Sequence, residues 1–288
     1  MIYYYAHSGH KFGLDCVRRA AALINELKKE GIEVELLVND FRAGLAAREL
    51  GVAGSVTIET VLDVDAVAKR GDSVILDTPE DLTPCLEHYT DGFNPLFCVT
   101  DHCTTPSRYG EIYLSPSCQE EENCKETPMI DSEYFDALPK EDRTVFFLGD
   151  ADYDKIILSH QDFFDGLELD LILGHYFFVK YEDELSKIFH HLHEAEEYST
   201  LVRSSKRVIT RSSQCALESK AAGADVIYMK KPDDSACLIK QLASCGVKII
   251  DNFDKQALLL LLDISQSGQK RVNQINILSK SLIQRLNL

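Results

Sequence analysis

The chain has 288 residues, with 30 basic and 47 acidic side chains, so its formal net charge is −17. This charge speaks against binding of nucleic acid through phosphates and against docking on an anionic membrane surface, since both depend on lysine and arginine. The apolar share of 45% and the charged share of 27% are those of an ordinary globular protein. The length predicts one large domain or two medium ones.

No stretch of the sequence has the pattern of a secretion signal or a membrane helix. Residues 1–5 lack a basic region, and the most apolar window, residues 257–262, is much shorter than the roughly 20 residues that span a bilayer. The nine cysteines are odd in number and scattered, which favours reduced thiols. We therefore expect a cytoplasmic protein that neither inserts into a membrane nor binds nucleic acid.

The first part of the chain alternates strand and helix signals. A β-rich run at 2–6, a loop with two glycines, an amphipathic helix over 15–29 and a strand at 34–38 predict a parallel βαβ unit. Further strands are predicted at 74–77, 97–101 and 112–114.

Residues 120–154 have a different composition. They hold 12 acidic and 3 basic side chains, a net charge of 3 − 12 = −9, together with Pro128 and Pro139. The first part of this stretch therefore predicts a solvated connection between domains. We place the domains at residues 1–142 and 143–288.

A second alternating series follows the acidic stretch. Its predicted strands are 145–148, 169–173, 208–210, 226–229 and 248–250, and its predicted helices are 182–192, 213–222 and 234–244. From Asp254 onward an amphipathic helical end is predicted, with an apolar side formed by Val272, Ile275, Leu278, Leu282 and Leu286. The predicted fold class is α/β, with two Rossmann-like domains facing a cleft and helices at the C-terminus.

The most informative segment is 208–228, which predicts strand, serine turn, short helix, glycine stop and strand. Ser212 and Ser213 lie where the helix begins, so their hydroxyls and the amide groups behind them could hold an anion. Glu218 follows five residues after Ser213 and could accept hydrogen bonds from ribose hydroxyls. The alternative is a serine helix cap followed by a surface glutamate.

The pattern Ser-Ser-x-x-x-x-Glu, followed by Ala-Ala-Gly and a β-run, resembles the nucleotide-binding segment of GT-B glycosyltransferase-like proteins. The resemblance is greatest to the UDP-sugar hydrolases of pseudaminic acid biosynthesis and to spore-coat polysaccharide proteins. The loop with Gly13 and the helix with Arg18 resemble the Gly-His-x-x-Arg segment of that family. Residues 147–152 stand where the family has a glycine-rich turn, and the strand before Gly174 resembles the one that approaches the base.

This resemblance implies an enzyme of surface-glycan biosynthesis that hydrolyses or transfers the sugar of a UDP-sugar. We predict no cofactor, and whether a divalent ion assists stays open. The second domain would bind the nucleotide through Gly174, Ser212, Ser213 and Glu218, and the first would face the sugar or an acceptor. Two alternatives stay open: a glycosyltransferase proper with an unknown acceptor, and a non-catalytic relative with a regulatory or protein-binding role. The oligomeric state stays open as well.

The sequence departs from the family at two places. The family's catalytic histidine precedes the arginine by three positions, where this chain has Asp15. A carboxylate is a weaker base than imidazole at neutral pH, so His10 in the same loop is a second catalytic candidate. Gly13 and Arg18 are substrate-binding candidates. The turn at 147–152 lacks the paired glycines and carries two aspartates, which favours the non-catalytic alternative.

The loop after the predicted strand at 97–101 supplies further candidates. Ligands of open parallel sheets bind beyond the carboxyl ends of the strands. Asp101, His102 and Arg108 are therefore substrate-binding candidates, and ordinary loop polarity is the alternative.

Two groups of side chains raise the question of a metal. Cys98, Cys103, Cys118 and Cys124 could suit tetrahedral zinc, but their spacing misses the usual C-x2-C, so buried or incidental thiols are favoured. His190, His191 and His193 are predicted on the end of a helix, where His190 and Glu194 could share a metal. A solvated helix end is favoured there, and we predict no metal site.

Overall fold

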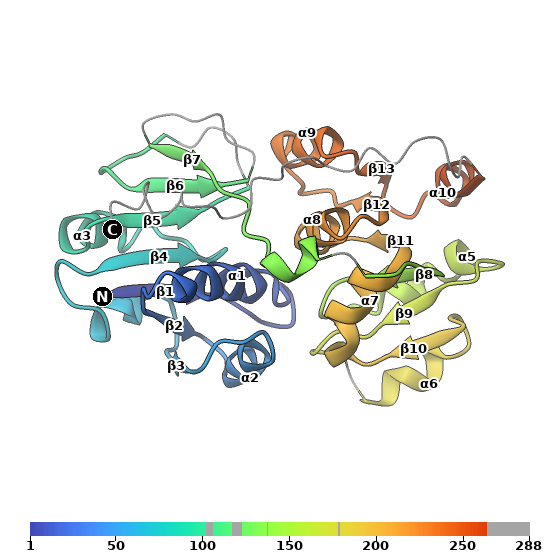
Figure 1. Ribbon diagram of the computed structural model, residues 1–288, viewed down its shortest axis with the longest axis horizontal. Coiled ribbons are helices and arrows are strands. Elements are labelled where there is room, and N and C mark those ends of the chain that lie inside the picture. The colour runs from blue at the N-terminus through green and yellow to red at the C-terminus, as the bar shows by residue number, and fades with distance from the viewer. Residues whose placement is uncertain (102–105, 117–122, 137, 178, 264–288) are drawn as a thin grey trace. The chain divides into compact units, whose positions relative to one another are not determined.

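The computed structural model describes residues 1–101, 106–116, 123–136, 138–177 and 179–263. The chain divides into two compact units. Among the described residues, the first contains Met1–Gly9 and Leu14–Ser132, and the second contains His10–Gly13 and Glu133–Asp263. Each unit is a parallel β-sheet with helices packed on it (Figure 1), which confirms the prediction of two Rossmann-like α/β domains.

The first unit is built on a seven-stranded sheet in the order β3-β2-β1-β4-β5-β6-β7. Its elements are β1 (Ile2–Ala6), α1 (Asp15–Lys29), β2 (Val34–Val38), α2 (Phe41–Glu49), β3 (Ser55–Thr57), the 3-10 helix η1 (Val61–Ala66), β4 (Ser73–Asp77), α3 (Leu86–Gly92), β5 (Leu96–Val99), β6 (Ile112–Ser115) and β7 (Cys124–Glu126).

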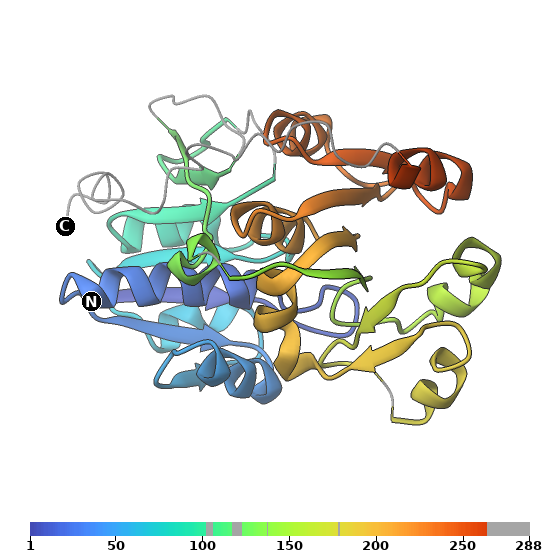
Figure 2. The same cartoon turned by 45° about the vertical axis from the view of Figure 1, so that its right-hand side comes forward.

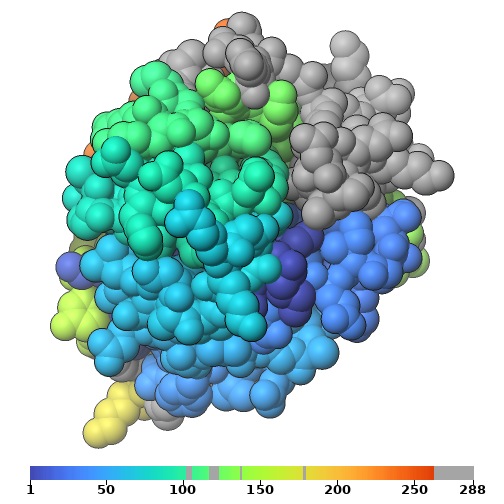
Figure 3. Space-filling view, turned by 90° about the vertical axis from the view of Figure 1, so that its left-hand side faces the viewer, coloured from blue at the N-terminus to red at the C-terminus, as the bar shows by residue number. Residues whose placement is uncertain are grey.

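The predicted βαβ unit is present with the predicted bounds. β1 pairs in parallel with β2, from Ile2 beside Val34 to Ala6 beside Val38, and α1 packs on both strands (Figure 2). Figure 3 views this unit from one side, where the start of the chain lies between the segments around β2 and β4, as the strand order requires. β4, the middle strand of this sheet, is buried at every residue, which is why most of it reads as a continuous apolar run.

The acidic stretch is not simply a solvated connection, contrary to the prediction. Among its described residues, β7 extends the first sheet by pairing in parallel with β6. Met129 and Ile130 are each only 2% exposed, and the Met129 sulfur lies 3.4 Å from the buried hydroxyl oxygen of Tyr4. Charge density misled the prediction because a few apolar side chains are enough to anchor this segment in the core.

The second unit is built on a six-stranded parallel sheet in the order β10-β9-β8-β11-β12-β13. Its elements are η2 (Ser132–Phe135, beginning in the first unit), β8 (Glu141–Phe147), α4 (Ile156–Ser159), α5 (Gln161–Phe164), β9 (Asp170–Ile172), η3 (Val179–Tyr181), α6 (Glu182–Leu185), β10 (His191–His193), η4 (Ala195–Glu197), α7 (Tyr198–Ser204), β11 (Ser205–Thr210), α8 (Ser213–Ala221), β12 (Asp225–Lys230), α9 (Ala236–Ser244), β13 (Lys248–Asp251) and α10 (Lys255–Asp263).

The core of this unit follows one row of side chains across the sheet. Leu171, Phe146, Ile209 and Ile227 occupy neighbouring positions on β9, β8, β11 and β12. All four belong to an apolar cluster that also contains side chains of α5, α6 and α10. The predicted helical end is thus confirmed for α10, whereas its later apolar side, with Val272, Ile275, Leu278, Leu282 and Leu286, lies outside the described residues.

The helix predicted over 182–192 is wrong in its second half. α6 ends at Leu185, and His191–His193 form strand β10, which pairs in parallel with β9. The apolar spacing of Leu185, Ile188 and Leu192 fits a helix, but pairing with β9 overrides it. The three histidines therefore do not lie on a helix.

Candidate functional site

Helix α8 begins directly beyond the carboxyl end of β11. Ser212 is its N-cap residue, and its hydroxyl oxygen accepts a hydrogen bond from the amide of Cys215 at 2.9 Å. Ser213 is the first helical residue, and both serines are buried. The first amides of a helix lack intrahelical acceptors and carry its positive dipole end, so this turn has the electrostatics of an anion site.

Glu218 lies in the same helix and is not a surface residue, since only 2% of it is exposed. The Tyr198 hydroxyl donates a hydrogen bond to one carboxylate oxygen at 2.6 Å, and the Gln214 amide donates to the other at 2.8 Å. Of the alternative interpretation, a serine cap followed by a surface glutamate, the cap is therefore confirmed and the surface glutamate is wrong. Gln214 could have been found from its i, i+4 spacing to Glu218, whereas no sequence signal points to Tyr198.

A second group of predicted residues gathers around Asp150, which follows β8. A methyl group at Gly174 would overlap the backbone of Asp150, and a Cβ at Gly13 would stand 3.1 Å from an Asp150 carboxylate oxygen. The Tyr176 amide donates a hydrogen bond to the Asp150 carbonyl at 2.9 Å. The structure thus brings Gly13, Asp150 and Gly174 together within the second unit.

Asp152, the other carboxylate of that turn, has a structural role. It is buried and accepts hydrogen bonds from the amides of Ile156 and Ile157, at 2.6 and 3.1 Å, and from the Tyr181 hydroxyl at 2.6 Å. Asp152 therefore binds the first amides of α4. The aspartate that departs from the family pattern here stabilises the local fold.

His10 packs with the second unit although it belongs to the loop between β1 and α1. Its side chain lies on aromatic rings, with the ring centroid 5.0 Å from that of Tyr176 and 6.5 Å from that of Tyr153. Because Tyr176 follows the Gly174 turn, His10 joins the group around Asp150. The sequence interpretation missed both tyrosines.

Asp15 and Arg18 belong to the first unit and form an ion pair one turn apart on α1, with Arg18 Nη1 3.3 Å from Asp15 Oδ1. Arg18 is buried, and Asp15 is partly exposed. The catalytic candidate Asp15 is thus a partly exposed carboxylate beside a buried guanidinium.

The sequence interpretation also missed Arg19. Its guanidinium donates two hydrogen bonds to the carboxylate of Asp77 at the carboxyl end of β4, from Nε to Oδ2 at 2.8 Å and from Nη2 to Oδ1 at 2.7 Å. The Tyr4 hydroxyl donates to the same carboxylate at 2.9 Å. Next to this network, Glu80 accepts a hydrogen bond from the Tyr5 hydroxyl at 2.6 Å and lies 3.2 Å from His7 Nδ1.

Asp101 and Arg108 do not lie at one edge of the sheet, contrary to the prediction. Asp101 is exposed and follows the carboxyl end of β5. The Arg108 amide donates to the buried carboxylate of Glu111 at 2.9 Å, immediately before the amino end of β6. β5 and β6 run parallel, so these ends are at opposite edges. His102 lies outside the described residues.

The two described cysteines of the zinc hypothesis are core residues. Cys98 and Cys124 are buried on β5 and β7, and Tyr113 of β6 stands between them in the register. Two strand spacings separate their backbones by about 9–10 Å, too far for one ion. Burial raises the pKa of the Cys98 thiol to about 12. Cys103 and Cys118 lie outside the described residues.

The other described cysteines only partly fit the expectation of reduced thiols. Cys16, Cys85 and Cys215 are free thiols, whereas Cys237 is disulfide-bonded.

Among the helices in the described ranges, none is both long and apolar enough to cross a membrane.

Comparison with known proteins gives structural relatives at low sequence identity. The UDP-GlcNAc 2-epimerase of Methanocaldococcus jannaschii, in complex with UDP-GlcNAc and UDP, is 10% identical with a TM-score of 0.63, over 100% of this chain and 99% of that one. A glycosyltransferase from Rickettsia africae is 10% identical with a TM-score of 0.61, over 99% and 96%. The UDP-GlcNAc 2-epimerase of Neisseria meningitidis bound to UDP-GlcNAc is 12% identical with a TM-score of 0.58, over 100% of both chains.

No protein-family model matches the sequence, and no curated protein matches it. At these identities the structural likeness speaks for the fold. The chain has the GT-B-like architecture of two Rossmann-like domains that the sequence predicts.

Proposed function

We propose that this protein binds a nucleotide sugar, with a UDP-sugar favoured, and acts in surface-glycan biosynthesis in the cytoplasm. The observation that carries the proposal is helix α8, which begins at a serine cap beyond the carboxyl end of β11 and holds the buried carboxylate of Glu218. Two proteins of the same fold support the choice of ligand, because their structures contain UDP-GlcNAc.

In this proposal the second domain, residues 143–288, binds the nucleotide. The diphosphate lies at the amide end of α8 near Ser212 and Ser213, and the ribose hydroxyls donate to Glu218. Tyr198 and Gln214 already fix that carboxylate, so little conformational entropy is lost when a ligand binds. The turn at Gly174 lies beside the base.

Residues 1–142, the predicted first domain, supply the candidates for contacts with the sugar or an acceptor. They are Arg18, Asp101, His102 and Gly13, although the structure groups Gly13 with the second unit. Water or a sugar hydroxyl attacks the anomeric carbon while His10 or Asp15 removes its proton, and the helix-end amides stabilise the departing diphosphate.

Calorimetric titration of the protein with UDP, CMP, GDP and TDP tests the binding. We expect one nucleotide to bind and Glu218→Gln to weaken it about tenfold or more, as for loss of hydrogen bonds to a charged group. Glu184→Gln, which changes a partly exposed glutamate of the same unit, is the matched control and should leave the affinity unchanged. Failure of all four nucleotides to bind would overturn the proposal.

Product analysis with UDP-GlcNAc, with and without candidate acceptors, separates the possible reactions. Free sugar indicates hydrolysis, acceptor-dependent product indicates transfer, and a changed sugar indicates epimerisation as in the named neighbours. If catalysis occurs, replacing the true base among His10→Gln and Asp15→Asn should lower kcat by roughly 10²–10⁴-fold. Binding without any turnover would favour the non-catalytic alternative.

A further inference from the structure

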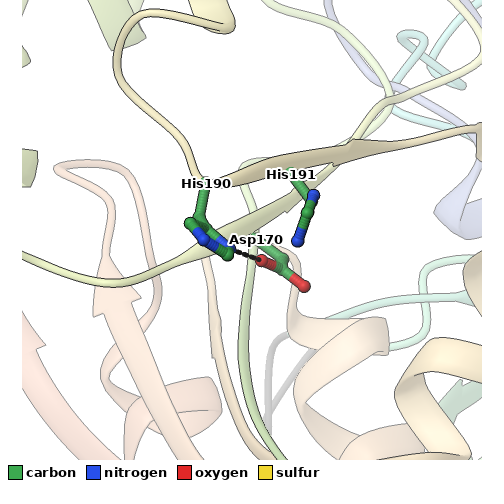
Figure 4. Close-up of side chains that lie close together, drawn as sticks. All are labelled: Asp170, His190 and His191. Carbon is green, nitrogen blue, oxygen red and sulfur yellow. Dashed lines mark ion pairs between the residues drawn. The ribbon is translucent and has the colours of Figure 1, made fainter.

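Three metal-ligating side chains converge on the amino ends of β9 and β10. Asp170, His190 and His191 each offer a ligand atom, and these atoms all lie within 4.8 Å of one another. Figure 4 shows the two imidazoles on either side of the carboxylate, with His190 Nδ1 3.8 Å from Asp170 Oδ1. The centroids of the two rings are 4.2 Å apart.

The parallel pairing of the two strands creates this arrangement. Asp170 is the first residue of β9 and stands beside His191, the first residue of β10, in the register. The His190 amide donates to the Leu169 carbonyl at 2.9 Å, which fixes the backbone just before the paired residues. The ligands therefore come from rigid elements, and only the exposed imidazoles need to adjust when an ion binds.

A second set of contacts orients the buried carboxylate. His193 Nε2 lies 3.1 Å from Asp170 Oδ2, and Arg143 Nε lies 3.5 Å from the same oxygen. These groups occupy Oδ2, so Oδ1 is the oxygen that faces His190. Outer partners that fix a ligating carboxylate in this way are typical of metal sites.

We propose that Asp170, His190 and His191 bind a divalent transition-metal ion of the zinc type. Imidazole nitrogen and carboxylate oxygen are ordinary zinc ligands, and three protein ligands leave a fourth position to water. Calcium and magnesium favour all-oxygen sites and do not fit two imidazoles. The positive charge of Arg143 opposes the ion, but it lies at the far carboxylate oxygen.

This site is independent of the proposed nucleotide site. It lies at the amino edge of the second sheet, whereas Ser212 and Gly174 follow the carboxyl ends of β11 and β9. β10 is the edge strand of that sheet. A bound ion would tie this edge strand to β9, so metal binding should stabilise the second unit without requiring a nucleotide.

Titration of untagged, metal-free protein with Zn²⁺ and Co²⁺ tests the proposal. We expect one ion per chain, and at least a tenfold weaker affinity in His190→Gln and in His191→Gln. Both side chains are exposed, so these variants should fold, which circular dichroism verifies. His88→Gln is the matched control, because exposed His88 has a single carboxylate partner, Asp65 at 3.4 Å, and its loss should not change the affinity.

Two further readouts locate the ion. Bound Co²⁺ should absorb in the visible without the charge-transfer band of a thiolate ligand, and Zn²⁺ should raise the thermal unfolding midpoint of the wild type but not of His191→Gln. Failure of the wild type to bind either ion would overturn the proposal. Equal binding by His190→Gln and His191→Gln, or a thiolate band, would place the ion elsewhere and overturn it as well.

Discussion

The two units satisfy the hydrogen-bonding capacity of their buried carboxylates in different ways. In the first unit Asp77 meets a cation, the two-pronged guanidinium of Arg19. In the second unit Glu218, the sixth residue of α8, receives hydrogen bonds from the neutral donors Tyr198 and Gln214. An internal ion pair neutralises its own charges, whereas a carboxylate held by neutral donors keeps its negative charge and can accept hydrogen bonds from a ligand. This difference is one reason why we propose that Glu218 of the second unit binds the ribose hydroxyls of a nucleotide.

The largest effect should come from breaking the ion pair. Arg19→Met leaves the buried carboxylate of Asp77 without its cation and should lower the free energy of unfolding by about 3–5 kcal/mol. Chemical denaturation measures this loss. The exposed Arg42→Met is the control and should change stability by less than about 0.5 kcal/mol. Equal losses of unfolding free energy in the two variants would show that the Arg19–Asp77 ion pair contributes no more to stability than an exposed arginine.

A smaller loss should follow a change in the second unit. Gly174→Ala forces a methyl group against the backbone of Asp150 and should cost about 1–3 kcal/mol of unfolding free energy. Gly54→Ala, where an added Cβ meets nothing within 4 Å, is the control. If Gly174→Ala is as stable as the control, the two turns are not packed as described.

Two serine caps in the second unit allow an effect on stability to be separated from an effect on nucleotide binding. Ser212 caps α8 and Ser235 caps α9, each accepting a hydrogen bond from a helix amide, at 2.9 and 3.1 Å. Replacing either by alanine should cost about 1 kcal/mol of stability. Only Ser212→Ala should also weaken nucleotide binding in the calorimeter. Equal loss of affinity in both variants would contradict a site at α8.

The smallest effect concerns a third way of satisfying a buried carboxylate. Burial alone would raise the pKa of Glu111, but hydrogen bonds from the amides of Arg108 and Tyr109 and from the Tyr113 hydroxyl lower it overall. A pKa that is lower in the folded chain gives stability that is present above the unfolded value, about 4.3, and is lost as the pH falls through the folded value. Glu111→Gln should remove this acid-range loss, which denaturation at several pH values measures.

The sequence predicted the long elements well because their patterns are local. β1, α1 and β2 occupy the predicted residues, since β-rich runs and an apolar helix face decide their structure without help from distant residues. Of the three-residue strands in the described ranges, β3, β7 and β10 were missed, and only β9, inside the apolar run predicted at 169–173, was found. So few residues carry no reliable period, and only pairing with a neighbouring strand makes them extended.

The candidate site was predictable only in part, for a similar reason. Ser212 and Glu218 share one helix, so their spacing could be read directly. Tyr198, Tyr176 and Arg19 reach their partners through the tertiary fold. The histidines at β10 show the same limit, because Asp170 joins them from twenty residues away only once two strands pair.

Each sheet ends in very short strands: β3, β7 and β10 have three residues, and β13 has four. An outer strand presents a row of backbone donors and acceptors to which another polypeptide can add. Three or four residues offer too short a template for a foreign strand to settle on. These short edge strands therefore disfavour edge-to-edge pairing of the sheets between protein molecules. Long, straight edge strands would pair at the same protein concentration.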